Sequence, residues 1–168
     1  MYQEILEKNL RFIQEQKLYH PLDSQVVDLV ETLNSQKIVT LSGLRHSGKT
    51  KLIHALLKKT QSFRECFYYN SDIDSLWVIK SEKDLIVLLD MYVRIYGVPK
   101  IIVLQNTNNI VGIKGFIAQL YKTKKYKLII AGNNIKIEWV RDIELFPLGI
   151  DTEKISESTN SGKVKWKD

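Results

Sequence analysis

The stretch KIVTLSGLRHSGKTKLI, residues 37–53, decides the fold. It opens with an apolar run, KIVTLSG (37–43), that is typical of a buried strand, and helical spacing of apolar residues follows it at Leu52, Ile53, Leu56 and Leu57. Between the two, GLRHSGKT (43–50) matches the pattern G-x-x-x-x-G-K-[ST] in full. In that pattern the glycines let backbone N–H groups wrap a phosphate, and the helix N-terminus adds a positive dipole. The stretch therefore predicts a phosphate-binding loop between a strand and a helix.

Residues of this loop have separate expected roles. Lys49 supplies a point charge to the β- and γ-phosphates of a nucleotide, and Thr50 offers its hydroxyl to Mg²⁺. His46 stands at a free position of the pattern, where a spacer or a weak phosphate contact is favoured over a catalytic base. The predicted phosphate-binding set is Gly43, Arg45, His46, Ser47, Gly48, Lys49, Thr50 and Lys51.

Strands and helices alternate along the rest of the chain. Apolar runs predict further strands at 66–70, 100–105, 126–133 and 142–149. Helical spacing predicts two helices before residue 37, one after the loop, one opened by a capping box at Ser81 and Asp84, and one over 115–123. Because the strands are near-continuous runs of Ile, Val and Leu, we predict an α/β fold with a parallel sheet covered on both faces.

Composition places the chain among soluble globular proteins, with 44% hydrophobic and 26% charged residues. No apolar run approaches the roughly 20 residues that a membrane span needs, and the acidic, helical N-terminus is unlike a signal peptide. The single cysteine, Cys66, excludes an internal disulfide and fits a reducing compartment. We therefore expect a cytoplasmic location, no membrane partner, and Cys66 as a small strand hydrophobe.

The net positive charge is compatible with a polyanionic partner. The 25 Lys and Arg residues against 19 Asp and Glu give a net charge of +6. The densest basic run is YKTKKYK (121–127), for which a solvated helix end is the favoured interpretation. His20, His46 and His54 lack metal-ligand spacing, so no zinc site is expected.

Several segments together resemble the AAA+-type ATPases of archaea and bacteria that couple a P-loop module to a C-terminal domain. In chain order these segments are GLRHSGKTKLI, FYYNSDID, IIVLQNTNNIVGIKGFIAQLYKT, KLIIAGNNIKI and ELFPLGIDTE. The resemblance implies a three-layer P-loop NTPase fold with a mostly parallel five-stranded sheet in the order 5-1-4-3-2, and ATP or ADP with Mg²⁺ as cofactors. It also implies that Asn133 faces the γ-phosphate as a sensor, and a turn is the equally open interpretation of Asn133 and Asn134.

The third strand departs from the family pattern, in which an apolar strand ends in L-D-E. Here Gln105 and Asn106 stand at the two acidic positions, a degenerate Walker B motif. The Asp normally holds the hydration shell of Mg²⁺ and the Glu orients or deprotonates the attacking water, whereas amides accept no proton at neutral pH. A missing general base costs about 10²–10⁴ in rate. Asp72 and Asp74 are expected at the far edge of the sheet, and Asp90 outward on a helix, so none is expected to substitute.

These features predict a module that binds ATP or ADP with Mg²⁺ and hydrolyses ATP weakly or not at all, so that nucleotide is a structural or switch ligand. One alternative is an active ATPase completed by a protein partner or a homo-oligomer; Arg141 could act there in trans, although a surface ion pair is its favoured interpretation. Another is a degenerate module that binds nucleic acid or protein through its basic surface. A small-molecule kinase is less favoured, because nothing resembles a substrate lid with arginines.

Residues 1–150 are expected to form one ATP-binding domain, in which residues 1–36 contribute the N-terminal helices. Residues 151–168, DTEKISESTNSGKVKWKD, are polar and lose periodicity, and are interpreted as a tail or a truncated linker.

Overall fold

The computed structural model describes residues 1–16, 23–74, 77–133 and 135–146. Within these ranges the helices are α1 (Tyr2–Gln14), α2 (Asp23–Gln36), α3 (Lys49–Lys59), α4 (Glu82–Tyr96) and α5 (Ile113–Thr123). The strands are β1 (Ile38–Gly43), β2 (Cys66–Asn70), β3 (Ile101–Gln105), β4 (Lys127–Gly132) and β5 (Asp142–Leu145). None of these helices is long and apolar enough to cross a membrane. His20, Asn134 and the polar segment 151–168 lie outside the described residues.

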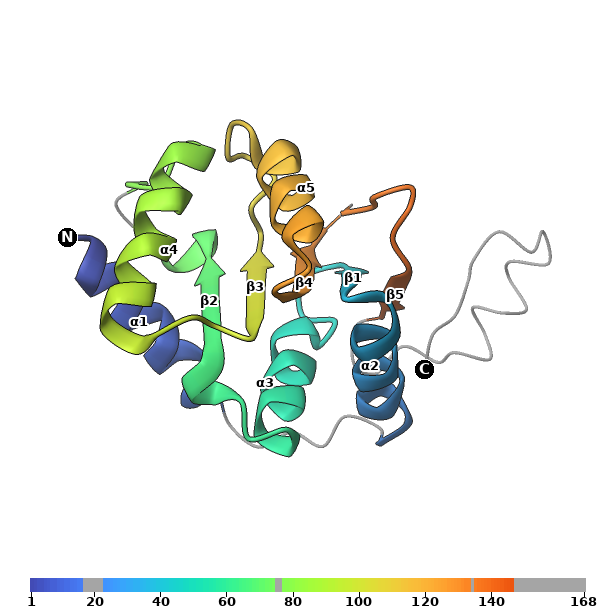
Figure 1. Cartoon of the computed structure of the whole chain (residues 1–168). Coiled ribbons are helices and arrows are strands. Elements are labelled where there is room, and N and C mark those ends of the chain that lie inside the picture. Colours follow the sequence, from blue (N-terminus) through green and yellow to red (C-terminus); the bar gives the residue numbers. More distant parts are fainter. Residues whose placement is uncertain (17–22, 75–76, 134, 147–168) are drawn as a thin grey trace.

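The five strands form one parallel sheet in the order β2-β3-β4-β1-β5 (Figure 1). The predicted order 5-1-4-3-2 is this order read from the other edge, so it is confirmed. The helix predicted over 115–123 begins earlier, at Ile113, because Gly112 adopts a left-handed φ of 80° and serves as its N-cap.

Helices cover both faces of the sheet (Figure 1), as the continuous apolar strands require. One core cluster joins α2 and α3 to alternate strand residues, among them Leu29, Leu33, Val39, Leu41, Ile53 and Leu57. The other joins α4 and α5 to the opposite strand face, among them Leu85, Leu88, Ile102, Leu104, Phe116 and Ile130. The two clusters together make a three-layer α/β core.

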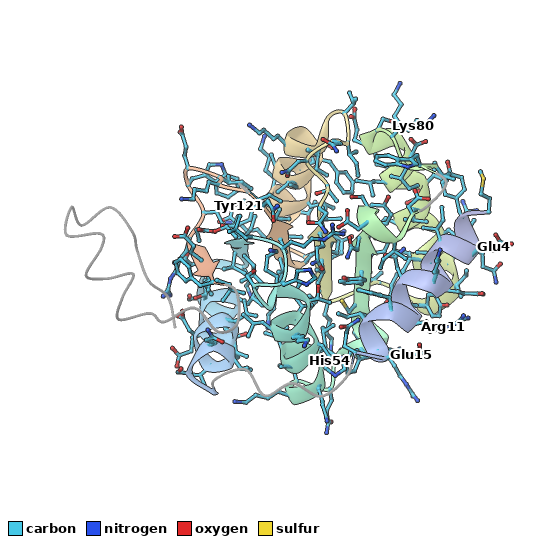
Figure 2. All side chains as sticks on the ribbon, turned by 180° about the vertical axis from the view of Figure 1, so that it is seen from behind. Glu4, Arg11, Glu15, His54, Lys80 and Tyr121 are labelled. Carbon is cyan, nitrogen blue, oxygen red and sulfur yellow. The ribbon has the colours of Figure 1, made fainter. Side chains whose placement is uncertain are left out.

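Helix α1 closes the β2 edge of the sheet. Its buried residues Ile5, Leu6, Asn9 and Ile13 face the core, while Glu4, Arg11 and Glu15 lie along its outer side (Figure 2). The buried ring of His54 on α3 is 2.7 Å from the carbonyl oxygen of Ile13, measured from Nδ1. This histidine therefore ties α3 to α1.

Cys66 is buried in β2, which confirms its interpretation as a small strand hydrophobe. Burial raises the pKa of its thiol, so the thiolate is disfavoured and the sulfur is chemically inert.

The capping box predicted at Ser81 and Asp84 is present at the start of α4. The Asp84 carboxylate accepts hydrogen bonds from the backbone N–H groups of Lys80 (2.9 Å) and Ser81 (3.1 Å). These bonds, the one from Lys80 first, lower the pKa of the Asp84 carboxyl. The ionised carboxylate therefore stabilises the helix start.

We predict that Asp84→Asn lowers the free energy of unfolding at pH 7 by about 1 kcal/mol, the usual size of a lost cap. Because the folded-state pKa is depressed, the contribution of Asp84 is present above its unfolded pKa of about 3.9 and is lost as the pH falls through the folded-state value. Urea unfolding at pH 7 and at pH 3 should show the difference between wild type and variant shrinking in acid. Asp90→Asn, at an exposed position of the same helix, is the control and should change little at either pH.

Candidate functional site

The loop between β1 and α3 lies at the carboxyl edge of the sheet, where the strands end. Gly43 has a φ of 153°, and a Cβ atom there would lie 2.5 Å from the carbonyl oxygen of Leu145 and 2.7 Å from Oγ of Ser47. Gly48 is the N-cap of α3 with a left-handed φ of 94°. Both conformations favour glycine, which is why these two positions of the pattern carry it.

Lys49 is the buried centre of the loop, with 6% of its surface exposed. Its ammonium donates to the carbonyl oxygens of Gly43 (2.5 Å) and Leu44 (2.8 Å) and to Oγ of Ser47 (3.2 Å). Desolvation lowers the pKa of Lys49. Three oxygens thus hold a poorly hydrated cation inside the loop, where an anion is its natural further partner.

The remaining predicted contacts surround this cation at different depths. Arg45 and His46 are exposed at the loop tip, and His46 has a left-handed φ of 64°. Ser47 is buried, whereas Thr50 and Lys51 are half-buried in the first turn of α3. The loop tip therefore exposes Arg45 and His46 to solvent above a buried lysine.

Gln105 ends β3 directly beside the first turn of α3. It is buried, and its Nε2 donates to Oγ1 of Thr50 at 2.9 Å. Its Oε1 accepts from the hydroxyl of Tyr68 at 2.7 Å, and that hydroxyl in turn accepts from Nδ2 of Asn70 at 3.3 Å. Because the Tyr68 hydroxyl accepts from Asn70, its own proton is directed at Gln105. This arrangement holds the amide nitrogen, rather than the amide oxygen, against Thr50.

Asn106 follows with a left-handed φ of 56°, a conformation that asparagine tolerates. Its Nδ2 donates to Oδ1 of Asn70 at 3.2 Å and to Oδ2 of Asp72 at 2.9 Å. Its carbonyl oxygen accepts from the hydroxyl of Ser71. A neutral N–H donor, held by the turn after β2, therefore follows Gln105 at the end of β3.

Asp72 lies closer to the strand ends than the far-edge position of β2 suggests. Strand β2 does lie at the far edge of the sheet, but the turn after it returns the exposed Asp72 to hydrogen-bonding distance of Asn106. Asp74 is different: its Oδ2 accepts from the backbone N–H of Ile79 (3.1 Å) and the hydroxyl of Tyr69 (3.4 Å). Asp72 is thus a carboxylate near the strand ends, and Asp74 holds the following segment.

Asn133 follows β4, which pairs with β1 and so ends beside the loop. It is exposed, and its carbonyl oxygen accepts from Nδ2 of Asn108 at 3.1 Å. Arg141 forms an ion pair with Asp28 at 2.8 Å and donates to Oγ1 of Thr32 at 2.9 Å. The ion-pair interpretation of Arg141 is therefore confirmed.

Sequence reasoning missed a second polar cluster beside the loop strand. The Asp142 carboxylate accepts from Oγ1 of Thr40 at 2.7 Å and from Oγ of Ser42 at 2.6 Å. The signal was the alternation of hydroxyl residues within the apolar strand IVTLSG. Both carboxylate oxygens are engaged, so this cluster fastens β5 to β1.

Comparison with protein families shows which family has this fold and loop. The chain matches an AAA domain over residues 35–145. The chain belongs to this AAA domain family. The AAA match covers β1 to β5, so the sheet and its phosphate loop form an AAA-type P-loop module.

Other comparisons are more distant. The solved structure of PCH-2 from C. elegans matches with 11% sequence identity and a TM-score of 0.40, over 85% of this chain and 46% of that chain. This chain thus spans about half the length of that one. No match was found among curated proteins.

Proposed function

We propose that this AAA-type module binds ATP or ADP at the loop 43–50 and hydrolyses ATP slowly or not at all. The single observation that carries this proposal is the amide of Gln105, which occupies the carboxylate position beside Thr50 and donates to its hydroxyl. Nucleotide then serves as a structural or switch ligand, which stabilises the fold by mass action.

Phosphate recognition is supported by the loop itself. The first backbone N–H groups of α3 lack intrahelical partners and lie beside the buried ammonium of Lys49. An entering phosphate would exchange for the loop oxygens that now surround this ammonium. Arg45 and His46 at the loop tip, and Asn133 beside the loop strand, stand where they could contact the outer phosphates.

The residues present fit Mg²⁺ poorly. Magnesium takes oxygen ligands and is usually bound through one or two carboxylates together with substrate phosphates. Thr50, the expected ligand, accepts an N–H from Gln105, and the amide oxygen of Gln105 is engaged by Tyr68. We therefore expect the loop, rather than a metal ion, to supply most of the affinity for nucleotide.

Slow hydrolysis follows from the same amides. Asn106 offers Nδ2 to Asn70 and Asp72, and an amide cannot take the proton of an attacking water. The loss of a general base corresponds to about 10²–10⁴ in rate.

We predict that Lys49→Ala weakens ATP and ADP binding by about tenfold or more, since each hydrogen bond to a charged group contributes about 1.5–3 kcal/mol. Calorimetric titration measures the affinity, and phosphate release is followed in the same samples. Lys59→Ala, at the exposed far end of α3, is the matched control and should bind like wild type. Equal binding by wild type and Lys49→Ala, or no binding by wild type, contradicts the proposal.

We further predict that wild type binds nucleotide almost equally with Mg²⁺ and with EDTA, whereas Gln105→Asp gains Mg²⁺-dependent affinity of about tenfold or more. The physical reason is that aspartate replaces an N–H donor with an anionic oxygen. Gln105→Asn shortens the side chain equally without adding charge and should stay insensitive to Mg²⁺. The prediction fails if wild type already requires Mg²⁺ to bind.

A second candidate function, a slow ATPase, is favoured by one observation. Asp72 reaches Asn106 through one carboxylate oxygen, Oδ2, at 2.9 Å. The turn after β2 therefore brings a carboxylate to the strand ends that the sequence pattern alone does not provide. A second copy of the chain or a protein partner that brings a carboxylate is the other route to turnover.

If wild type releases phosphate, Asp72→Asn should reduce turnover by about 10²-fold or more while nucleotide affinity changes little, because a general base acts on the chemical step. Asp90→Asn, an exposed aspartate on α4, is the control. Turnover that survives Asp72→Asn but rises with protein concentration would assign the carboxylate to another subunit instead.

A further inference from the structure

A basic hollow lies at the amino edge of the sheet, opposite the phosphate loop. It has a volume of about 200 Å³ and opens between the ends of α2 and α3 and the starts of β3 and β4. Apolar side chains of Leu33, Leu56 and Tyr126 form part of its wall, and no aspartate or glutamate is among the described residues that line it. Its lysines are Lys37, Lys100, Lys124, Lys125 and Lys127.

A second hollow of about 440 Å³ adjoins the first and shares Lys37 and Lys124 with it. Tyr121 and Trp139 line this second hollow, with ring centroids 4.8 Å apart. Trp139 is 54% exposed, so part of its ring is accessible to a ligand. The two hollows together form a groove with lysines along it and an aromatic platform at one end, which we call the amino-edge groove.

The lysines of the groove are only partly neutralised. Lys100 pairs with Glu65 at 3.0 Å, but both side chains are exposed, so the pair contributes little. Lys127 donates to the neutral amide oxygen of Asn34 at 2.7 Å. Lys37, Lys124 and Lys125 make no ion pair with any residue that the structure describes.

Helix dipoles balance part of the positive charge of these lysines. Lys37 follows the C-terminus of α2, and Lys124 is the C-cap of α5, where a cation is favourable. A helix terminus carries only about half an elementary charge, so one lysine more than balances each. Because Lys100 has Glu65 as its counter-charge, Lys125 and Lys127 remain as excess positive charge around the hollow.

We propose that the amino-edge groove binds a single-stranded nucleic acid, with phosphates on the lysines and a base stacked on Trp139. Cationic grooves combined with exposed aromatic rings are the general solution for binding single strands without sequence preference. Strand β1 separates the groove from the phosphate loop by about 20 Å, at roughly 3.3 Å for each of its six residues. A single-stranded nucleic acid in the groove and a nucleotide at the phosphate loop can therefore be bound at the same time.

The test is fluorescence anisotropy with labelled oligo-dT and oligo-rU of 20 nucleotides, and with a duplex of the same length, at 50 and 200 mM KCl. Wild type should bind the single strands more tightly than the duplex. Comparison of oligo-dT with oligo-rU shows whether the groove prefers DNA or RNA. Lys124→Gln/Lys125→Gln should weaken binding about tenfold and reduce the salt slope by about 0.7 for each phosphate that is no longer neutralised. Trp139→Ala should weaken binding about tenfold while leaving the salt slope unchanged.

Lys80→Gln/Lys83→Gln is the matched control, since it removes the same charge from exposed lysines at the start of α4. Lys80 lies on a different side of the molecule from Tyr121 (Figure 2), and this variant should bind within about twofold of wild type. Lys49→Ala should likewise retain oligonucleotide binding, which keeps this site distinct from the nucleotide loop. Circular dichroism and thermal unfolding verify that each variant folds.

Four results would overturn the proposal. No single-strand binding at 50 mM KCl removes it outright. Equal losses in the two double-lysine variants would show that overall charge, rather than the groove, attracts the oligonucleotide. Full affinity in Trp139→Ala, or weakened binding in Lys49→Ala, would place the strand elsewhere on the surface.

Discussion

Burial of the parallel sheet on both faces is the constraint from which the remaining structure follows. Strands such as IIVLQ at 101–105 are fully buried, so the accessible polar groups gather at the two edges where strands begin and end. The carboxyl edge carries the phosphate loop and the amides of Gln105 and Asn106. The amino edge carries lysines that precede strands, such as Lys37 and Lys100. Each edge therefore has one dominant chemistry, set by which residues flank the strands.

At the carboxyl edge a continuous hydrogen-bonded chain replaces the expected charges. It runs from Thr50 through Gln105 and Tyr68 to Asn70, and Asn70 continues it to Asn106. Neutral partners satisfy one another without the desolvation penalty that a buried carboxylate incurs without a cation. The buried tyrosine reinforces this, because burial raises the pKa of Tyr68 and keeps its hydroxyl protonated.

The sequence predicts what depends on local pattern. Three features could be located because each depends on residues close together in the sequence: the phosphate loop, the strands and the capping box of Ser81. Even the sheet order followed from the resemblance, once the strand–loop–helix unit was placed. The proximity of Gln105 to Thr50 could also be inferred from the resemblance, because it assigns both positions to the surroundings of Mg²⁺.

Contacts between segments distant in sequence were out of reach. Asp72 reaches Asn106 through a short turn whose direction no periodicity encodes, and Asp142 meets Thr40 across about a hundred residues. The amino-edge groove is assembled from the ends of α2, α3 and α5 and the segment before β5, an arrangement that the basic run at 121–127 does not reveal by itself. A run of charged residues indicates a binding surface only when the fold brings several such residues together.

Helix α3 is the element that connects the two edges. It begins at Lys49 in the phosphate loop, and Leu56 near its end lines the amino-edge groove. Coupling between the edges would require α3 to have two discrete positions. Its inward face, including Leu52, Ile53 and Leu57, is at most 1% exposed and is packed into the core beneath the sheet, where a shift would open voids. We therefore expect this packing to hold each proposed site in shape, and the affinity at one edge to be independent of occupancy at the other.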